Sequence, residues 1–269
     1  MELIGLIPAA GTAARLAPLP CSKELLPVRG ADSGAPPAPV IRGLLDRMRA
    51  AGVSRAYIVI RDGKWDLPRY LGDGQAMSLP LSYLMMGDPS GPPFTLDQAY
   101  PFVRDATVVF GFPDIIVEPA DVYTPLIERL EHSPADVMLG LFPAHAPQEM
   151  DMVEADEHGI VRSLWLKPPR TELRDAWICA VWRPAFTEFL HEQIRFLRLS
   201  RPAGHARPPE LSVGHLLQAA LQAGLRLESV RFPEGRYVDI GTPDGWRRAL
   251  LDGIADDTPA ASRHSECDR

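Results

Sequence analysis

The sequence has little lysine, little cysteine and no long apolar run. Of its 28 basic residues all are arginine except Lys23, Lys64 and Lys167. The formal net charge is −7, which argues against a protein that binds nucleic acid through the phosphate backbone. No apolar stretch approaches the roughly 20 residues that a membrane-spanning helix requires. We therefore expect neither nucleic acid nor membrane as a partner.

Cysteine usage and the first residues bear on where the protein works. Cys21, Cys179 and Cys267 are odd in number and far apart, so we expect no disulfide framework and a cytoplasmic protein. The start of the sequence has no basic segment ahead of an apolar one, so we expect no signal peptide. The histidines form no zinc motif, and no serine has the context of a nucleophile elbow. Zinc chemistry and serine hydrolysis are not supported.

The pattern of apolar residues predicts a layered α/β fold. Hydrophobic residues make up 46 % of the chain and charged residues 23 %, as in a globular protein with a buried core. Stretches with the character of strands alternate with helical patterns, which is typical of an α/β sheet. The expected strands cover residues 2–8, 56–60, 107–110, 136–142 and 225–232. The expected helices cover residues 40–51, 121–132, 185–199 and 210–223.

No linker clearly divides the chain. We expect a single domain over residues 1–255, with an elaborated C-terminal half. Residues 31–39 are rich in proline, glycine and alanine, which predicts an exposed insertion. Residues 256–269 are polar, and we expect them to form a disordered tail.

A loop of small residues follows the first expected strand, at residues 9–14. Backbone N–H groups in such a loop can hold phosphate oxygens, and small side chains let a nucleotide approach closely. Arg15 and Lys23 would add the positive charge that a triphosphate requires. Neither a Walker loop nor the GxGxxG of a dinucleotide site is present. By itself the loop is equally well interpreted as a tight turn between a strand and a helix.

Two aspartates stand at the ends of expected strands. Asp114 comes just after the strand at residues 107–110, and Asp239 precedes a Gly-Thr-Pro turn in which Thr242 is an expected N-cap. Ligands bind at the carboxyl ends of strands in open α/β sheets. Mg²⁺ typically uses one or two carboxylates plus substrate phosphates, so this pair would suffice to hold it. Taken singly, Asp114 is more simply an ordinary turn residue.

Lys167 follows an apolar run and precedes a proline. The ordinary interpretation is a solvated strand end. In a chain that uses arginine almost throughout, however, a lysine fits a site that needs a compact ammonium rather than a planar guanidinium. We therefore keep Lys167, with Lys23, as a candidate for binding an anion.

These elements, in this order, resemble the sugar-phosphate nucleotidyltransferases. The resemblance extends over residues 2–252, and its strongest motifs are residues 8–15, the Ser-Lys-Glu-Leu-Leu-Pro-Val block at 22–28 and the Val-Asp-Ile-Gly-Thr-Pro block at 238–243. It implies a Rossmann-like three-layer α/β/α sandwich with a mixed, mostly parallel sheet. The implied reaction transfers a nucleoside monophosphate from an NTP to a sugar 1-phosphate and releases pyrophosphate. dTTP or UTP is the favoured donor, and Mg²⁺ is the implied cofactor.

The resemblance also implies roles for individual residues. These are nucleotide binding by Ala10, Gly11, Thr12, Ala13 and Gln98; catalysis by Arg15 and Lys23; binding of the sugar phosphate by Lys167; and metal binding by Asp114 and Asp239. The implied partners are an NTP and a sugar phosphate. Because relatives of this kind are commonly dimers or tetramers, the resemblance is also compatible with a homo-oligomer.

The recognition residues depart from the family pattern. The loop has alanine where the family is richer in glycine, which is tolerable unless a residue there needs a positive φ. Leu166 stands where a family glutamate reads sugar hydroxyls, and Met86 where thymidylyltransferases have a glutamine. The sequence therefore specifies neither base nor sugar. The alternative is a nucleotide-binding or nucleotide-sugar-binding relative that has lost catalysis and acts as a sensor or partner.

Overall fold

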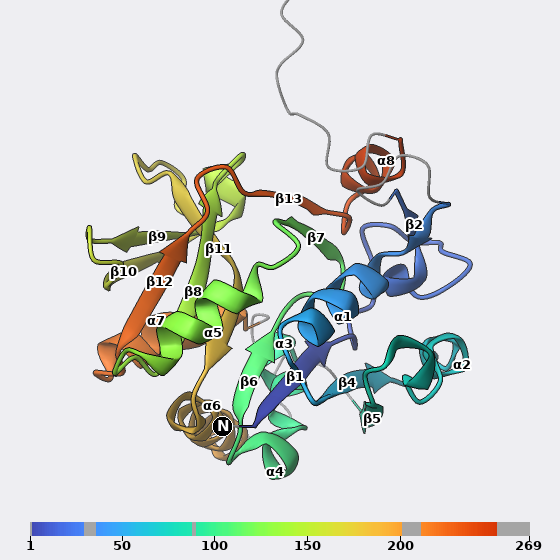
Figure 1. Ribbon diagram of the computed structural model, residues 1–269, viewed down its shortest axis with the longest axis horizontal. Coiled ribbons are helices and arrows are strands. Elements are labelled where there is room, and N and C mark those ends of the chain that lie inside the picture. The colour runs from blue at the N-terminus through green and yellow to red at the C-terminus, as the bar shows by residue number, and fades with distance from the viewer. Residues whose placement is uncertain (1, 30–35, 88–89, 201–210, 252–269) are drawn as a thin grey trace, which may run out of the picture.

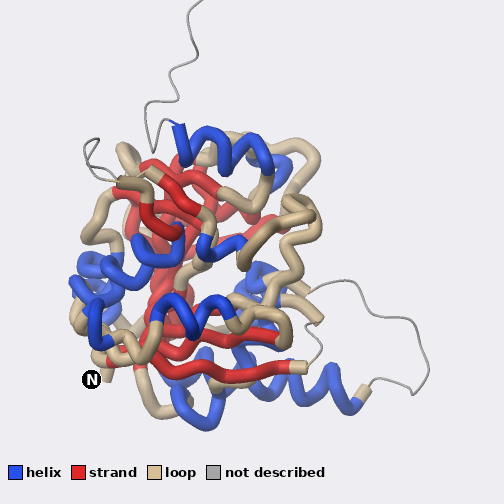
Figure 2. The backbone as a smooth tube through the Cα atoms, turned by 90° about the vertical axis from the view of Figure 1, so that its right-hand side faces the viewer, coloured by secondary structure: helices blue, strands red, loops and turns tan. Residues whose placement is uncertain are grey.

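The computed structural model describes residues 2–29, 36–87, 90–200 and 211–251 and has helices on both faces of a central sheet (Figures 1 and 2). The strands are β1 (Leu3–Pro8), β2 (Pro27–Val28), β3 (Ala38–Pro39), β4 (Arg55–Arg61), β5 (Leu81–Met86), β6 (Thr107–Phe110), β7 (Ile115–Glu118), β8 (Val137–Pro143), β9 (Asp151–Ala155), β10 (Val161–Leu166), β11 (Asp175–Trp182), β12 (Leu227–Arg231) and β13 (Arg236–Asp239). The helices are α1 (Val40–Ala50), α2 (Asp66–Leu71), α3 (Pro92–Asp97), α4 (Tyr100–Val103), α5 (Tyr123–Glu131), α6 (Pro184–Leu199), α7 (Val213–Gln222) and α8 (Pro243–Leu251). Short 3₁₀ turns include η1 (Lys23–Leu25).

The main sheet is mixed around a parallel centre. Strands β6, β1, β4 and β5 lie side by side and parallel. The long strand β11 runs antiparallel to β6 and also pairs with β8 and β9, and it thereby joins the parallel centre to the remaining strands of the sheet. Strand β12 is parallel to β8. This arrangement confirms the expected Rossmann-like α/β fold.

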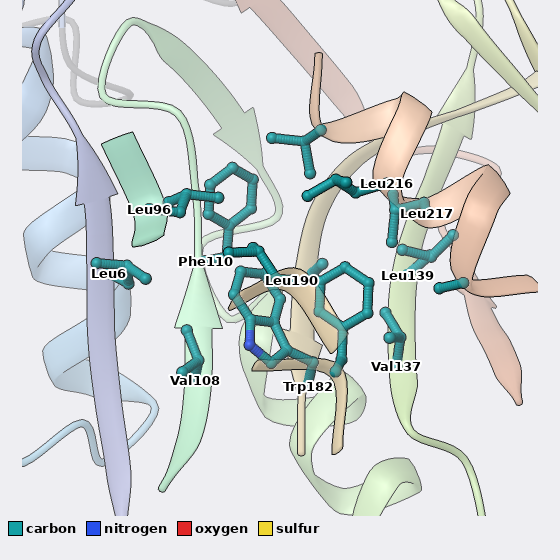
Figure 3. Close-up of a cluster of buried hydrophobic side chains, with 14 of the residues drawn as sticks. Leu6, Leu96, Val108, Phe110, Val137, Leu139, Trp182, Leu190, Leu216 and Leu217 are labelled. Atoms are coloured by element: carbon teal, nitrogen blue, oxygen red, sulfur yellow. The ribbon is translucent and has the colours of Figure 1, made fainter. Parts of the chain in front are cut away.

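Alternation along the strands divides the core into two layers. In β6, Val108 and Phe110 face the side covered by α3, α6 and α7, and Val109 faces the side covered by α1 and α5. Figure 3 shows the first layer, in which Phe110 and Trp182 lie between strands and helices. Because both faces of the central strands are covered, their residues are apolar almost throughout.

The expected elements agree with the structure to within a few residues. The strand predicted over residues 107–110 has those bounds, and the helix predicted over 185–199 is α6, which begins one residue earlier. Residues 31–35 of the predicted insertion and all of the tail at 256–269 lie outside the described residues. Within the described part of the chain, no helix combines the length and the apolar character needed to cross a bilayer.

A small second sheet and α8 stand apart from the main sheet (Figure 1). Strand β13 pairs antiparallel with β7, so that Asp239 lies opposite Ile115. The N-cap expected at Thr242 is present, since its hydroxyl accepts a hydrogen bond of 3.1 Å from the backbone N–H of Gly245. This pairing brings residues 236–239 back to the carboxyl end of β6.

Candidate functional site

The loop of small residues leaves β1 at the carboxyl edge of the parallel strands. The Ala9 N–H still continues the sheet, because it donates to the Val59 carbonyl at 2.8 Å. Beyond it, the backbone N–H groups of Gly11, Thr12 and Ala13 donate to no acceptor within the described part of the chain. Ala10 is buried, whereas Gly11 and Thr12 are exposed. The loop therefore presents a row of unused donors of the kind that binds phosphate oxygens.

Ala13 adopts the left-handed backbone conformation, with φ +54°. Alanine is tolerable in this loop only where no positive φ is needed. Ala13 does not meet that condition, because the Cβ of an L-residue clashes with the backbone at positive φ. Its carbonyl accepts a hydrogen bond from the Leu16 N–H at 2.9 Å, which closes the turn. The loop thus keeps its shape at the cost of local strain.

Replacing Ala13 by glycine is expected to raise the free energy of unfolding by roughly 0.5 kcal/mol. Relief of about 1–2 kcal/mol of left-handed strain outweighs the roughly 0.5–1 kcal/mol lost to the greater freedom of glycine in the unfolded chain. The neighbouring Ala14, which has no positive φ, is the matched control, and Ala14→Gly should lose roughly 0.5–1 kcal/mol. Urea unfolding measures both. Equal destabilisation by the two substitutions would contradict the expectation.

Lys23 extends from η1 to the loop and to Asp114. Its Nζ donates to Asp114 Oδ2 at 2.5 Å, and a Cβ placed on Gly11 would lie 3.8 Å from the same Nζ. Burial lowers the pKa of the Lys23 ammonium, but the contact with Asp114 and the negative charges of Glu24 and Asp239 together outweigh burial and raise the pKa above its ordinary value. Lys23 is therefore a fixed positive charge beside the unused amides.

The two aspartates, 125 residues apart in sequence, lie side by side. The pairing of β13 with β7 brings the segments together, and the Ile240 N–H donates to the Asp114 carbonyl at 3.0 Å. Asp114 is buried at 8 % exposure. Asp239 is exposed, but the protein around its carboxylate still removes part of its hydration. This desolvation, together with repulsion from Asp114, raises the pKa of Asp239.

Gly241 marks the point where these groups meet. A Cβ placed on this glycine would lie 2.8 Å from Asp239 Oδ1, 2.9 Å from Arg15 Nη2 and 3.5 Å from Asp114 Oδ2. The side chain of Arg15, which the sequence places at the end of the loop, therefore reaches the same place as the two carboxylates. Four of the predicted residues, Arg15, Lys23, Asp114 and Asp239, converge from three distant segments.

A cavity of about 410 Å³ opens beside this cluster. It is lined by residues 11–13, by most of the segment 17–23 and by most of the segment 61–66. Its volume suits a small ligand, and its lining brings the unused amides of the loop together with Lys23.

Two buried charged residues of this site were missed by the sequence analysis. Glu24 is fully buried, and both of its carboxylate oxygens accept hydrogen bonds of 2.7 Å from Nζ of Lys64. Lys64 lines the cavity and is only 7 % exposed. The scarcity of lysine singled out Lys64, but no motif linked it to Glu24, because the two residues are 40 positions apart.

Lys167 and Gln98 lie away from the convergence point. Lys167 follows β10, is exposed and has φ +43°. It faces the partly buried Asp151. Burial raises the pKa of Asp151, and the positive charge of Lys167 opposes that rise. The Gln98 amide donates to the Phe94 carbonyl of its own helix at 3.4 Å. Neither residue lines the cavity, so their predicted roles require a ligand that extends beyond it.

An aromatic wall connects the two regions. Phe112, between β6 and Asp114, packs against Trp177 of β11 with ring centroids 5.9 Å apart. Trp177 in turn lies close enough to Asp151 for its indole to lower the pKa of that carboxyl. These contacts link Phe112, two residues before Asp114, through Trp177 to Asp151, which faces Lys167.

Curated relatives of this chain are nucleotidyltransferases. The chain is 25 % identical over 244 residues to the low-salt glycan biosynthesis nucleotidyltransferase Agl11 of Haloferax volcanii, an alignment that covers 89 % of this chain and 63 % of the relative. It is also 25 % identical over 247 residues to a glucose-1-phosphate thymidylyltransferase of Streptomyces antibioticus, covering 88 % of this chain and 62 % of the relative. The chain therefore spans less than two thirds of the length of these relatives. No protein-family model matches it.

Solved structures with the same fold belong to the same kind of enzyme. A chain of Bacillus anthracis described as a glucose-1-phosphate thymidylyltransferase, in complex with a sucrose, superimposes with a TM-score of 0.78 at 19 % identity and covers 95 % of this chain and 97 % of its own. A UTP-bound UGPase of Acinetobacter baumannii gives 0.72 at 16 % identity, with 93 % of each chain covered. A UDP-glucose pyrophosphorylase complexed with UDP-glucose gives 0.73 at 18 % identity, covering 93 % of this chain and 97 % of that one. These structures share the fold, and the curated relatives confirm the resemblance to sugar-phosphate nucleotidyltransferases stated from the sequence.

Proposed function

We propose that the protein transfers a nucleoside monophosphate from an NTP to a sugar 1-phosphate, forming a nucleotide sugar and pyrophosphate. The observation that carries the proposal is the convergence of Arg15, Lys23, Asp114 and Asp239 beside a loop of unused backbone donors. Such a site holds a polyanion and a cation together. The similarity to nucleotidyltransferases supports the same reaction.

The reaction needs no covalent nucleophile on the protein. An oxygen of the sugar phosphate attacks the α-phosphorus of the NTP in line, the new P–O bond forms, and the bond to the β-phosphate oxygen breaks. Pyrophosphate leaves with the electron pair. The protein has to align two anions that repel each other and stabilise charge on the α-phosphoryl group and on the leaving group.

Each group in the site has a part in that task. The amides of Gly11, Thr12 and Ala13 bind phosphate oxygens of the NTP. Lys23 neutralises the α-phosphate, and Arg15 neutralises the leaving pyrophosphate through a fork of donors that matches phosphate oxygens. Ala10, buried beneath the loop, keeps the backbone close to the nucleotide. We assign Gln98 to binding of the nucleoside, for which dTTP or UTP is the favoured source.

The donor set at Asp114 and Asp239 fits Mg²⁺. Both are carboxylates, they lie close enough for Asp114 to raise the pKa of Asp239, and oxygen ligands are those that Mg²⁺ prefers. Within the described residues no cluster of three or more histidine, cysteine, aspartate or glutamate side chains forms, so the remaining ligands would be phosphate oxygens and water. When bound, the ion would supply positive charge to the phosphates during transfer.

Replacing Lys167 by methionine is expected to raise the KM for the sugar phosphate about 10–100-fold, because hydrogen bonds to charged groups contribute roughly 1.5–3 kcal/mol. The KM for the NTP should change little, since Lys167 lies outside the cavity. Steady-state kinetics with each substrate varied in turn separates the two values. Arg170→Met, at an exposed arginine of the same loop, is the matched control. A rise confined to the NTP would contradict the assigned role.

The alternative function is nucleotide or nucleotide-sugar binding without catalysis. Leu166 favours it, because an apolar residue beside Lys167 cannot read a sugar hydroxyl through a side-chain hydrogen bond. A sensor or binding partner would keep the loop and lose turnover. The same proteins can test both functions.

The deciding experiment measures pyrophosphate release for dTTP, UTP and the other NTPs against a panel of sugar 1-phosphates. Each pair is run with Mg²⁺ and with EDTA. Mg²⁺-dependent release with one pair supports the transferase and identifies base and acceptor together. No pyrophosphate release with any pair, together with NTP binding detected by calorimetry, supports the alternative of binding without catalysis. Sedimentation of the same sample tests whether the protein is a homo-oligomer. We further propose that the protein works in the cytoplasm.

A further inference from the structure

Both chain neighbours of Lys23 are held by one short segment, residues 64–66. On one side, the backbone N–H and the hydroxyl of Ser22 each donate to the Asp66 carboxylate at 2.6 Å. On the other side, Glu24 accepts from Lys64 at 2.7 Å through both of its oxygens. The hydrogen bonds from Ser22 hold the pKa of Asp66 below its ordinary value, although burial opposes them. We call Lys64 and Asp66 the 64–66 clamp.

The inner half of the clamp is a buried ion pair. Glu24 is 0 % exposed and Lys64 is 7 % exposed, so both charges are largely removed from water. Burial raises the pKa of Glu24 and lowers that of Lys64, and each is opposed by the charge of the other. A pair of this kind contributes little net stability, yet loss of one partner leaves a buried charge alone. Its value to the protein is therefore the geometry that it imposes.

That geometry acts on Lys23. This residue begins η1, a single 3₁₀ turn, and lies between the two anchored residues. A lysine has a long flexible stem, and its ammonium is placed reproducibly only if its backbone is fixed. With Ser22 and Glu24 both tied to residues 64–66, the Lys23 ammonium is confined between Gly11 and Asp114.

We propose that Lys64 and Asp66 are positioning residues, which hold Lys23 in place through Glu24 and Ser22 for its contact with the α-phosphate. The expected effect on kcat rests on the proposed function. The expected effect on the position of Lys23 does not. The clamp acts through hydrogen bonds to the neighbours of Lys23, and a misplacement of about 1 Å in a reacting site can cost roughly 100-fold in rate. Its loss should therefore lower turnover, in addition to the destabilisation that follows when one partner of a buried ion pair is removed.

The structural consequence is testable without substrate, because the chain has only three lysines. Brief treatment with acetic anhydride, followed by mass spectrometry of peptides, measures the acylation rate of each lysine. In the wild type, Lys23 should react slowly because its side chain is only 18 % exposed and bonded to Asp114. Glu24→Gln should accelerate acylation of Lys23 at least threefold, while exposed Lys167 keeps its rate.

Glu228→Gln is the matched control. Glu228 is also buried, at 2 % exposure, and it is paired with Arg226 at 2.8 Å on β12, outside the cavity lining. Its substitution should leave the Lys23 rate unchanged. An equal acceleration in Glu228→Gln would show general loosening, and no acceleration in Glu24→Gln would show that Lys23 is held without the clamp. Either result overturns the proposal.

The kinetic consequence is tested in the same variants. Glu24→Gln and Lys64→Met should lower kcat about 10–100-fold with a smaller change in the KM for NTP. Lys64→Arg should restore part of the loss, because a guanidinium also bonds a carboxylate through two donors. If Lys64→Met does not fold, Glu24→Gln/Lys64→Met removes both buried charges, and its Lys23 acylation rate and kcat should still change.

Failure of the clamp and failure of the proposed function give different results. A wild type that neither releases pyrophosphate nor binds NTP refutes the proposed function, and the acylation rates still decide the clamp. A wild type that turns over, with Glu24→Gln equal to it in kcat and in Lys23 acylation, refutes the clamp alone.

Discussion

Asp239→Asn should lower kcat for pyrophosphate release about 100–1,000-fold, because it removes one of the two carboxylates proposed to hold Mg²⁺, and the folded protein should be at least as stable as the wild type. Asn keeps the shape of the side chain and its carbonyl oxygen. It can still accept the hydrogen bond of 2.7 Å that Asp239 receives from the Gly241 N–H. The substitution removes only the negative charge. Loss of activity in a folded variant would therefore show that this charge is needed for the reaction.

The stability of this variant should depend on pH with a definite sign. In the wild type, partial burial and repulsion from Asp114 raise the pKa of Asp239 in the folded state, so the folded protein binds its proton more tightly than the unfolded chain. The ionised form therefore opposes folding, and the opposition grows as the pH rises from about 4, the ordinary aspartate value. Asp239→Asn should match the wild type below that pH and equal or exceed it in melting temperature at neutral pH.

Calorimetry with NTP separates the metal from the protein charges. In EDTA the two carboxylates repel a triphosphate, so Asp239→Asn should bind NTP at least as tightly as the wild type. Adding Mg²⁺ should tighten binding to the wild type and have little effect on the variant. Asp46→Asn, at a half-buried aspartate on α1 that pairs with Arg42, is the control. An Asp239→Asn protein that keeps more than a tenth of the wild-type kcat would refute the metal role.

The local order of the chain could be predicted from the sequence because it depends on short-range patterns. The helix face of Val40, Ile41, Leu44 and Leu45 and the buried run at 107–110 repeat with the periods of a helix and of a covered strand. Strands such as β5 and β7 were missed because their burial is irregular along the strand. Half-buried residues do not follow a single apolar period.

The site divides in the same way. Motifs that hold the backbone in one shape, such as the small-residue loop and the Thr242 cap, are visible in the sequence because the turn itself demands those residues. The ion pair between Glu24 and Lys64 is not visible in the sequence, because these residues meet only through the fold, from η1 and the turn before α2. Likewise, two aspartates at strand ends could be predicted as a pair, but their contact depends on the pairing of β13 with β7.

The strain at Ala13 shows a further limit. The sequence shows an alanine in place of a glycine, but not which residue of the loop has the positive φ. The structure places it between Thr12 and the turn that brings Arg15 towards Gly241. The same strained turn thus connects the unused amides of the loop to Arg15. The loop amides and Arg15 therefore belong to one continuous segment, to which we assign phosphate binding.

Arg15→Leu is expected to reduce kcat about 1,000-fold, an effect at the lower end of what a single arginine contributes to phosphoryl transfer. Arg15 Nη2 lies close to the aspartate pair, and within the described chain Arg15 forms no ion pair that would hold it for structure alone. Its side chain is exposed, so the free energy of unfolding should change by less than about 0.5 kcal/mol. Such a split between activity and stability is expected of a group whose contact forms mainly with the leaving pyrophosphate.

Two further variants make the Arg15 prediction decisive. Arg15→Lys keeps the charge and loses the planar fork, so it should recover only part of kcat if two phosphate oxygens are bound together. Arg49→Leu, at an exposed arginine at the end of α1, controls for the loss of surface charge and should keep wild-type kinetics. Steady-state pyrophosphate release gives kcat and KM for each protein. If Arg15→Leu raises the KM for NTP without lowering kcat, Arg15 binds the ground state, and the stabilisation of the departing pyrophosphate must come from Lys23 and the loop amides instead.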